Sequence, residues 1–274
     1  MQILYENQSR KIHCRNAEGH ILQCSQHLHY NIEIAFIYSG LTDVNVDNAQ
    51  TEKAESGDVI LVFPNQVHSF STVSPENHIL LLLDPQLFPE HSHLFAEYLP
   101  KSNIIKGAAK DRELCELIDS ISRLYKEPEQ PYRDAALKGY LLAFLSRLFA
   151  LAKFKKTNSE DMQAIGHVIN YCIANYSKNL SLDMLQKELH ISKYYISHIV
   201  NQKLGMNFND YVNSIRISNA CRYLREGNMS MLEISAAVGF NTVRTFNRSF
   251  VKQMGISPRA YRSNAADQAV GGEK

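Results

Sequence analysis

The stretch LQKELHIS at 185–192 recurs as ISAAVGFN at 234–241, and ISHIVNQKLG at 196–205 recurs as FNRSFVKQMG at 246–255. The first pair is offset by 49 positions and the second by 50, so the second copy carries one extra residue after its turn. In both copies the apolar positions follow helical spacing on each side of a short break, which predicts a short helix, a three-residue turn and a longer helix. Two helix-turn-helix units therefore organise the C-terminal part of the chain.

The longer helix of each copy is expected to expose a polar stripe. Ser192 suits the N-cap of the first such helix, and Ile196 and Val200 face its inner side. The outward positions of the two copies, which are related by a shift of fifty, are Tyr194, Ser197, His198, Asn201, Arg244, Asn247 and Arg248. Arg can bond guanine and Asn can bond adenine in the major groove of DNA, so the second helix is the better candidate for reading bases. The first helix, with Tyr194 and His198, is the better candidate for contacts with the DNA backbone that position the protein. For any one of these residues alone, an ordinary solvated helix face is the alternative.

A single helical pattern from 208 to 226, closed by Gly227, separates the two units. At 1.5 Å per residue it spans about 28 Å, which is close to the spacing of about 34 Å between successive major grooves on one face of DNA. Residues 161–264 hold 12 Lys and Arg against 6 Asp and Glu, whereas residues 1–160 hold 16 against 20. A basic C-terminal part behind an acidic N-terminal part favours a polyanion binder joined to a second module.

The first hundred residues contain short apolar runs of the β type, separated by turn residues. The runs 32–38, 58–63 and 79–83 end at Ser39-Gly40, Pro64-Asn65 and Asp84-Pro85. Strands of this length and spacing predict an antiparallel sandwich or barrel.

Four residues in this part have side chains that bind metals or polar ligands: His27, His29, Glu33 and His68. The first three share strand parity, so they are expected to point to one face. Three imidazoles and one carboxylate suit Zn, Mn, Fe or Ni. They also suit the wall of a polar pocket for an organic effector, or a hydrogen-bonded cluster without any ligand. The sequence leaves these three interpretations open, with no cofactor required.

The segment between the two parts has helical periodicity. Apolar residues at 114, 117, 118, 121 and 124, and again from 137 to 149, predict two helices with broad apolar faces. Such faces are buried either against the barrel or against a second subunit. Residues 153–161 are polar and read as a linker, and the Ala- and Gly-rich residues 265–274 read as a disordered tail.

Five cysteines without a C-x-x-C pair favour reduced thiols in a cytoplasmic protein. Glu6 interrupts any signal-peptide core, and the longest apolar stretch, near 140–152, is too short to span a bilayer. These features favour a chain that stays in the cytoplasm, without a membrane partner.

The residues of the repeat resemble the AraC/XylS-type DNA-binding domain. The matching segments include Gly205-Met206-Asn207-Phe208, Ile215-Arg216-Ile217, Val238-Gly239-Phe240-Asn241 and Gly255-Ile256-Ser257-Pro258. The spacing from His27 to Glu33, followed by Gly40, and the run from Gly57-Asp58 to His68 likewise resemble the two cupin motifs of AraC-type sensor domains. The second motif departs from the cupin pattern at Phe63, Asn65 and Thr72.

The resemblance implies an α+β protein of several domains. Residues 1–152 form a cupin-like effector-sensing β-barrel with dimerisation helices at about 111–152, and 153–161 is a linker. Residues 162–264 form an all-α domain with two helix-turn-helix units that bind DNA, and 265–274 is the tail. The implied function is sequence-specific regulation of transcription, usually activation, by a homodimer that binds promoter DNA and a small molecule such as a sugar and contacts RNA polymerase.

Two rival functions remain at this stage. Retention of all four His and Glu positions keeps open a metal-dependent cupin enzyme fused to a DNA-binding domain, although the altered second motif weakens that hypothesis. A DNA-binding scaffold that needs no effector is the other rival. The resemblance itself favours a regulator with no enzymatic activity.

Overall fold

A computed structural model describes residues 4–5, 11–47, 49–72, 75–127, 129–156, 160–227 and 229–271. The chain divides into two compact units, residues 10–159 and residues 160–274 with the first nine. We call them the sensor unit and the helical unit, and each is described by itself. Their composition, β-sheet in the first and helices in the second, confirms the predicted fold class.

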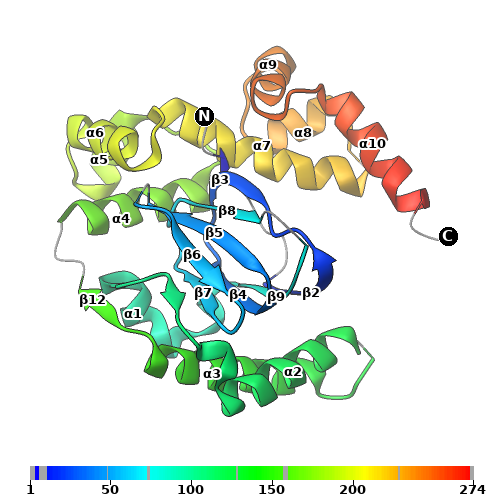
Figure 1. Ribbon diagram of the computed structural model, residues 1–274. Helices are drawn as coiled ribbons and strands as arrows, with labels where there is room; N and C mark the ends of the chain where they lie inside the picture. The colour runs from blue at the N-terminus through cyan, green and yellow to red at the C-terminus, as the bar shows by residue number, and fades with distance from the viewer. Residues whose placement is uncertain are drawn as a thin grey trace. The chain divides into compact units, whose positions relative to one another are not determined.

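The sensor unit is built on antiparallel strands in two sheets (Figure 1). One sheet has the neighbours β3-β8-β5-β6, and the other has the order β11-β7-β4-β9-β2. The strands of the sensor unit that precede its helices are β2 (Ile12–His20), β3 (Cys24–Leu28), β4 (Ile32–Ser39), β5 (Leu41–Val46), β6 (Glu52–Glu55), β7 (Val59–Val62), β8 (His68–Thr72) and β9 (Glu76–Leu83). Strand β1 (Leu4–Tyr5) lies in the first nine residues, which group with the helical unit.

Strand β4 shows how side chains divide between two cores. Alternate side chains point to opposite faces of a strand, so Ala35 and Ile37 join the core between the sheets, with Val44 and Phe70. Ile34 and Phe36 point the other way and join a second core. Glu33 has the parity of Ala35 and is therefore on the inner side of the sheet. The strand is apolar on both faces because both faces are buried.

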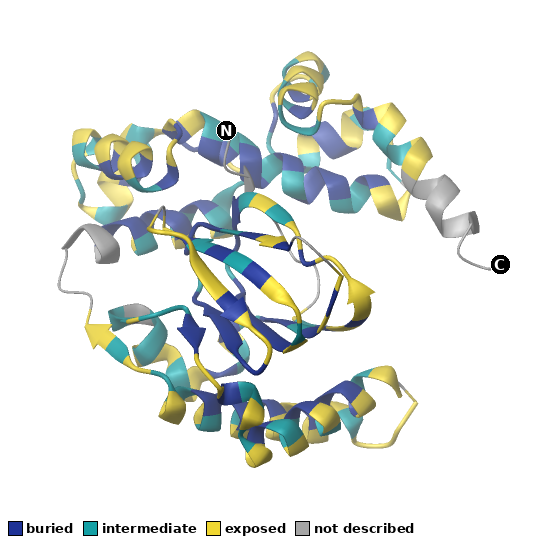
Figure 2. Cartoon of the chain, viewed as in Figure 1, coloured by how far each residue is buried: buried dark blue, intermediate teal, exposed yellow. Residues whose placement is uncertain are grey.

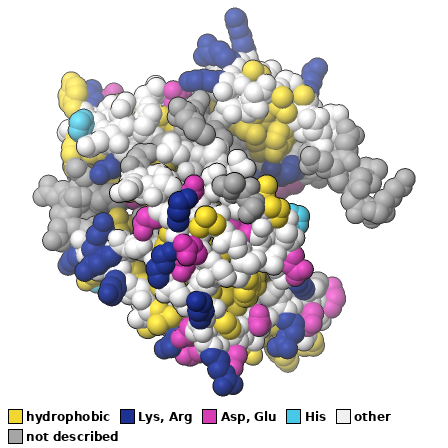
Figure 3. Space-filling view, in the orientation of Figure 1, with side chains coloured by type: hydrophobic (Ala, Val, Ile, Leu, Met, Phe, Trp, Pro, Cys, Tyr) yellow, Lys and Arg dark blue, Asp and Glu magenta, His cyan; other side chains and the backbone are white. Residues whose placement is uncertain are grey.

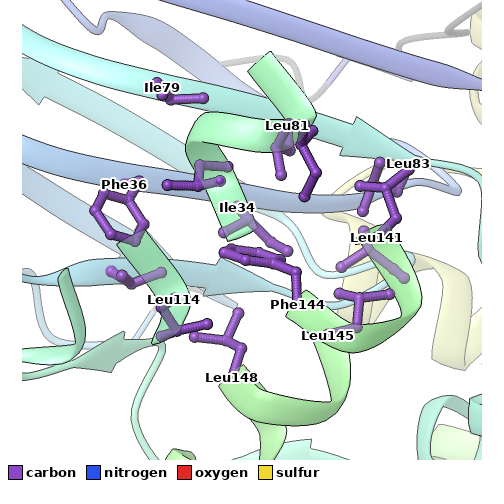
Figure 4. Packing of buried hydrophobic residues seen from close by; sticks show 14 of the residues in the cluster. Ile34, Phe36, Ile79, Leu81, Leu83, Leu114, Leu141, Phe144, Leu145 and Leu148 are labelled. Carbon is purple, nitrogen blue, oxygen red and sulfur yellow. The ribbon is translucent and has the colours of Figure 1, made fainter. Parts of the chain in front are cut away.

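Helices α2 (Arg112–Lys126) and α3 (Arg133–Leu151) cover the outer face of the β4 sheet (Figure 1). Asp111 caps α2 by accepting a hydrogen bond from the Leu114 amide, 3.0 Å away. Phe144 and Leu145 of α3 are fully buried against strand residues such as Leu81 (Figure 4). Each such side chain contributes about 1.5–3 kcal/mol when it leaves water, so the helices are integral to the sensor unit.

The predicted linker is partly structured. Residues 154–156 form strand β12 (Phe154–Lys156), which pairs antiparallel with β10 (Tyr98–Pro100) next to α1 (Ser92–Glu97) and before β11 (Ile104–Ile105). The Phe154 ring stacks on Phe63 at 5.6 Å between centroids. Partial burial of this one aromatic ring, together with the pairing with β10, explains why a polar segment becomes a strand. The linker residues 157–159 lie outside the described residues.

The helical unit contains α4 (Glu160–Asn175), α5 (Leu182–Leu189), α6 (Lys193–Leu204), α7 (Phe208–Glu226), α8 (Met231–Ala237), α9 (Val243–Met254) and α10 (Pro258–Gly271). Helices α5 and α6 form the first helix-turn-helix unit, joined by the predicted three residues. Helices α8 and α9 form the second, but five residues, 238–242, join them. Val238 and Gly239 already depart from helical geometry, so the connection is longer than expected. The prediction of a three-residue turn was therefore wrong for this copy.

The long helix α7 has the predicted bounds and contacts α6 of the first helix-turn-helix unit and α8 and α9 of the second (Figure 1). Ile217, Cys221 and Leu224 of α7 pack with Phe246 and Phe250 of α9 in one buried cluster. The predicted disordered tail was wrong for 265–271, which continue α10. Ala265, Ala266 and Ala269 explain the difference, because alanine has the highest helix propensity. Residues 272–274 lie outside the described part of the chain.

Among the residues that the structure describes, no helix is both long enough and apolar enough to cross a lipid bilayer.

Candidate nucleic-acid interface and buried histidine cluster

Helices α6 and α9 are built alike from local signals. Each has 12 residues and ends at a glycine in the left-handed conformation, Gly205 and Gly255. Ser192 caps α6 by accepting from the Tyr195 amide, and Thr242 caps α9 by accepting from the Thr245 amide. These caps fix where each helix begins, and therefore which residues share its outer face.

The seven predicted DNA-facing residues are all exposed on these two helices. Tyr194 is 79% exposed, which is unusual for an aromatic side chain without a partner surface to cover it. In α9, Phe246 and Phe250 are fully buried, whereas Arg244, Asn247 and Arg248 are exposed. Figure 2 shows both buried and exposed residues along this helix. Lys and Arg side chains project at the top of the space-filling view, where Figure 1 places α9 (Figure 3).

A contact between the two helix-turn-helix units was not foreseen from the sequence. The Arg216 guanidinium of α7 donates to the carbonyl oxygens of Tyr176 (2.9 Å) and Lys178 (2.8 Å), which follow α4. The same guanidinium lies 5.5 Å from the centre of the Phe240 ring, in the α8–α9 connection. Arg216 therefore contacts both the segment between α4 and α5 and the connection between α8 and α9. Only the folded chain brings these segments together.

The four predicted metal- or ligand-binding residues meet at one end of the sensor unit. His27 lies on β3, His29 just after it, Glu33 on β4 and His68 at the start of β8. All four are buried, and one ligand atom from each lies within 4.8 Å of the others. The sheets explain this convergence, because His27 is the register partner of His68 while Glu33 reaches them from the facing sheet.

The hydrogen bonds of the cluster orient its three imidazole rings. Each Nδ1 atom faces a backbone carbonyl oxygen: His27 that of Ser25 at 2.9 Å, His29 that of Asn31 at 3.1 Å, and His68 that of Gln66 at 2.9 Å. The Nε2 atoms of His29 and His68 lie 2.7 and 2.9 Å from the same Glu33 Oε2 atom. We call these four residues the histidine cluster.

Burial opposes ionisation of the Glu33 carboxyl, but the neighbouring imidazoles of His68 and His29 outweigh it and hold the pKa of Glu33 well below its usual range. The carboxylate is therefore charged. A buried charge needs a compensating positive group within reach, and the cluster is arranged to supply or to bind one.

A second buried polar group and a pocket also escaped the sequence analysis. The Thr42 hydroxyl donates to Glu76 Oε2 at 2.5 Å, and Glu76 Oε1 lies 3.2 Å from His78 Nδ1.

Separately, a pocket of about 580 Å³ opens beside α2, lined by Asn16, Glu18, Tyr38, Asn77, Ile79, Asp119, Ser122, Arg123, Lys126 and Glu127. Burial raises the pKa of the Tyr38 hydroxyl, so it stays a neutral donor in this pocket. These residues come from strands and a helix distant in sequence, which left no local motif to find.

Comparison with known proteins assigns both units. The family of AraC-like ligand binding domains matches residues 14–145, and a helix-turn-helix domain family matches residues 185–264. The chain thus combines a ligand-binding domain with a helix-turn-helix domain. It belongs to the AraC-type family of transcriptional regulators.

Two relatives and one solved structure illustrate the likeness. The chain is 25% identical to the HTH-type transcriptional activator RhaS of Pectobacterium carotovorum over 250 residues, 88% of each protein. It is 32% identical to the uncharacterized HTH-type transcriptional regulator YtdP of Bacillus subtilis over 96 residues, 35% of this chain and 12% of YtdP. The chain therefore spans far less than two thirds of the length of YtdP. ToxT from Vibrio cholerae superposes with a TM-score of 0.59 at 17% identity, covering 92% of this chain and 98% of ToxT, which shows the shared fold.

Proposed function

We propose that this chain binds promoter DNA in a sequence-specific way through α6 and α9 and activates transcription in response to a small molecule held by its sensor unit. The observation that carries the proposal is the pair of capped helices, each exposing the predicted polar stripe, packed on the single helix α7. With 19 residues, α7 is about 28 Å long. A spacer of this length suits the insertion of α6 and α9 into adjacent major grooves.

Within this proposal α9 reads bases and α6 chiefly positions the protein. Arg244 and Arg248 are suited to the O6 and N7 atoms of guanine, and Asn247 is suited to adenine. Tyr194 and His198 of α6 are suited to sugar, phosphate or thymine methyl groups, with Ser197 and Asn201 beside them. The excess of Lys and Arg over residues 161–264 adds the salt-dependent attraction to the DNA backbone.

The test measures affinity for a site selected from random DNA and for unselected DNA, by fluorescence anisotropy with the full chain. Arg244→Ala and Arg248→Ala should each cost about 1–3 kcal/mol on the selected site, which is a loss of about 5- to 150-fold. Arg112→Ala is the matched control, because this exposed arginine lies in the sensor unit and forms an ion pair with Glu116 on its own helix. Equal losses on selected and unselected DNA would reassign Arg244 and Arg248 to phosphate contacts.

The sensor unit offers two places for the small molecule, the histidine cluster and the pocket beside α2. The sequence favours the cluster, because His27, His29, Glu33 and His68 carry its resemblance to the two cupin motifs of AraC-type sensor domains. A sugar remains the predicted effector class. His29→Ala and His68→Ala should impair the response to effector while leaving DNA affinity within about twofold. Loss of response in Asp119→Ala instead, with the histidine variants unaffected, would move the effector to the pocket.

We also propose that the chain acts as a homodimer and contacts RNA polymerase. The exposed face of α3 supports the dimer, because Tyr140 and Leu151 are more than a third exposed there. Analytical ultracentrifugation of the full chain should show a dimer that Tyr140→Glu weakens. A monomer at micromolar concentration would remove this part of the proposal.

A further inference from the structure

The pocket beside α2 lies where the apolar core between the β4 sheet and the helices gives way to polar residues. On β4 the outward position after the buried Phe36 is Tyr38, which is 39% exposed and lines the pocket. On β9 the buried Ile79 has the exposed Asn77 as its outward neighbour. The pairing of these two strands shifts register between residues 37 and 39. Such irregularities re-aim side chains and are frequent next to active sites, so the sheet presents polar groups here instead of continuing its core.

The second half of α2 supplies a charged wall to the pocket. Its lining residues recur at spacings of three and four and therefore share one face of the helix, and they include Asp119, Ser122, Arg123 and Lys126. The three charged members are exposed, whereas Ser122 is buried. Glu18 of β2 lines the same pocket and adds a second carboxylate from the sheet. Charges of both signs thus surround one space.

The opposite charges on this wall do not neutralise each other. Arg112 and Glu116, four residues apart near the start of α2, form an ion pair at 2.8 Å. Asp119 and Arg123 have the same spacing on the same helix, and such pairs normally stabilise a helix. Among the residues that the structure describes, however, neither of these two nor Lys126 forms an ion pair. The wall therefore offers two cations and a carboxylate to a ligand.

The strands add neutral hydrogen-bonding groups to the pocket. The Asn77 Oδ1 atom accepts from the Gly19 amide at 2.8 Å, which holds the side chain and leaves its Nδ2 group to donate. The Tyr38 ring packs against Phe36 with the ring centroids 5.1 Å apart. Burial and the nearby charge of Asp119 raise the pKa of the Tyr38 hydroxyl, which therefore keeps its proton. The pocket combines charges on the helix with positioned donors on the sheet.

We propose that the pocket beside α2 binds a small zwitterion of the α-amino acid class, separately from any ligand of the histidine cluster. An α-amino acid has its carboxylate and its ammonium group on one carbon atom. It can therefore meet Arg123 and Asp119, which lie one helical turn apart, at the same time. Lys126 provides a second cation for the carboxylate, and Glu18 a second anion for the ammonium group. The volume of about 580 Å³ is within the range of small-molecule sites.

Other classes of ligand suit these charges less well. A phosphorylated or otherwise polyanionic molecule would meet the three carboxylates of Glu18, Asp119 and Glu127. A neutral sugar would cover Arg123 and Lys126 without giving them a counter-charge, which makes their desolvation costly. Amino acid binding does not depend on the proposed function of the chain. Its regulatory meaning rests on that function, because the ligand would bridge α2 to β4 and β9 of the sensor unit.

The test uses the full chain and free L-amino acids. Each protein-forming L-amino acid is screened at about 10 mM for a rise in Tm, and isothermal titration calorimetry then gives the Kd of the best one. We expect one site per chain. The amide of that amino acid lacks the negative charge, and its N-acetyl derivative lacks the positive charge. Each should bind at least about tenfold more weakly than the parent compound.

Variants of α2 locate the site. Arg123→Gln removes the cation and Asp119→Asn removes the anion with little change of size, and each should weaken binding about 10- to 100-fold. Arg112→Gln and Glu116→Gln are the matched controls, because these exposed residues of the same helix pair with each other and do not line the pocket. They should leave the Kd within about twofold. Circular dichroism shows whether each variant is folded.

Three results would overturn the amino acid site. They are the absence of any rise in Tm in the screen, derivatives that bind as tightly as the parent amino acid, and variants at Asp119 and Arg123 that bind like the unmodified chain. Affinity for selected DNA, measured on the same samples, separates the two proposals. Intact preference for selected DNA without amino acid binding refutes only this site, whereas lost preference in the unmodified chain refutes the proposed function.

Discussion

Replacing Gly239 by alanine tests whether a close contact holds the two helix-turn-helix units in one arrangement. Gly239 lies in the α8–α9 connection with φ of +86°, and a Cβ atom placed there would be 2.6 Å from the Ser177 carbonyl oxygen. A left-handed conformation costs a residue other than glycine about 1–2 kcal/mol. Forcing the backbone of 177 away costs about 1–3 kcal/mol more. We expect a local destabilisation of about 2–5 kcal/mol.

Gly255 provides the matched control for this experiment. Its φ of +75° is almost the same, but nothing lies within 4 Å of an added Cβ atom, so Gly255→Ala should cost only the conformational part of about 1–2 kcal/mol. Hydrogen exchange of the full chain, followed by mass spectrometry on peptides covering α8 and α9, reports the local opening free energy. Equal protection losses in the two variants would refute the contact between Gly239 and Ser177 as a source of rigidity.

Three further predictions concern single side chains. Arg216→Ala removes two charge-assisted hydrogen bonds and should lower protection of the segment after α4 by about 1.5–3 kcal/mol in the same exchange assay; unchanged exchange would contradict this role. Burial raises the pKa of Asp58, but Lys106 and the amides of Glu55 and Gly107 outweigh it, so its folded pKa is depressed. Asp58 therefore stabilises the fold above its unfolded pKa of about 4 and loses this effect as the pH falls through the folded value; denaturation between pH 3 and 6 should show a flatter acid limb in Asp58→Asn. Burial raises the pKa of Cys172 to about 12, so Ellman's reagent should label this thiol only after unfolding, and rapid labelling of Cys172 itself in the native chain would show that the helical unit opens.

Much of the helical unit follows from local sequence. Ser192, Asn207 and Ser230 cap their helices through bonds to amides three residues ahead, and Gly227 ends α7 in the left-handed conformation. Caps and a period of 3.6 residues act over one or two turns, so they can be read without knowing the fold. The exposed side of Arg244 and Arg248 follows from the buried side of Phe246 by the same rule.

Local patterns failed where a segment takes its structure from a distant partner. Residues 154–156 look like a polar linker, and they become a strand because β10 and the Phe63 ring are in place to receive Phe154. The prediction of a disordered tail was wrong at 265–271 for the opposite reason, because the local helix propensity of its alanines outweighs the breaking effect of Gly271.

The sequence by itself determined the β-rich first part, the two helices after it, the two helix-turn-helix units with their exposed stripes, and the four residues of the histidine cluster. Parity on β4 was enough to put Glu33 on the inner side of its sheet. Only the tertiary structure decided that the His68 ring meets Glu33, 35 residues away in the sequence, and that Arg216 donates to the carbonyl oxygen of Tyr176, 40 residues away. The physical reason is one of range. Helix periodicity and capping act between neighbours, whereas these two contacts join groups that sheet pairing and helix packing bring together only in the folded chain.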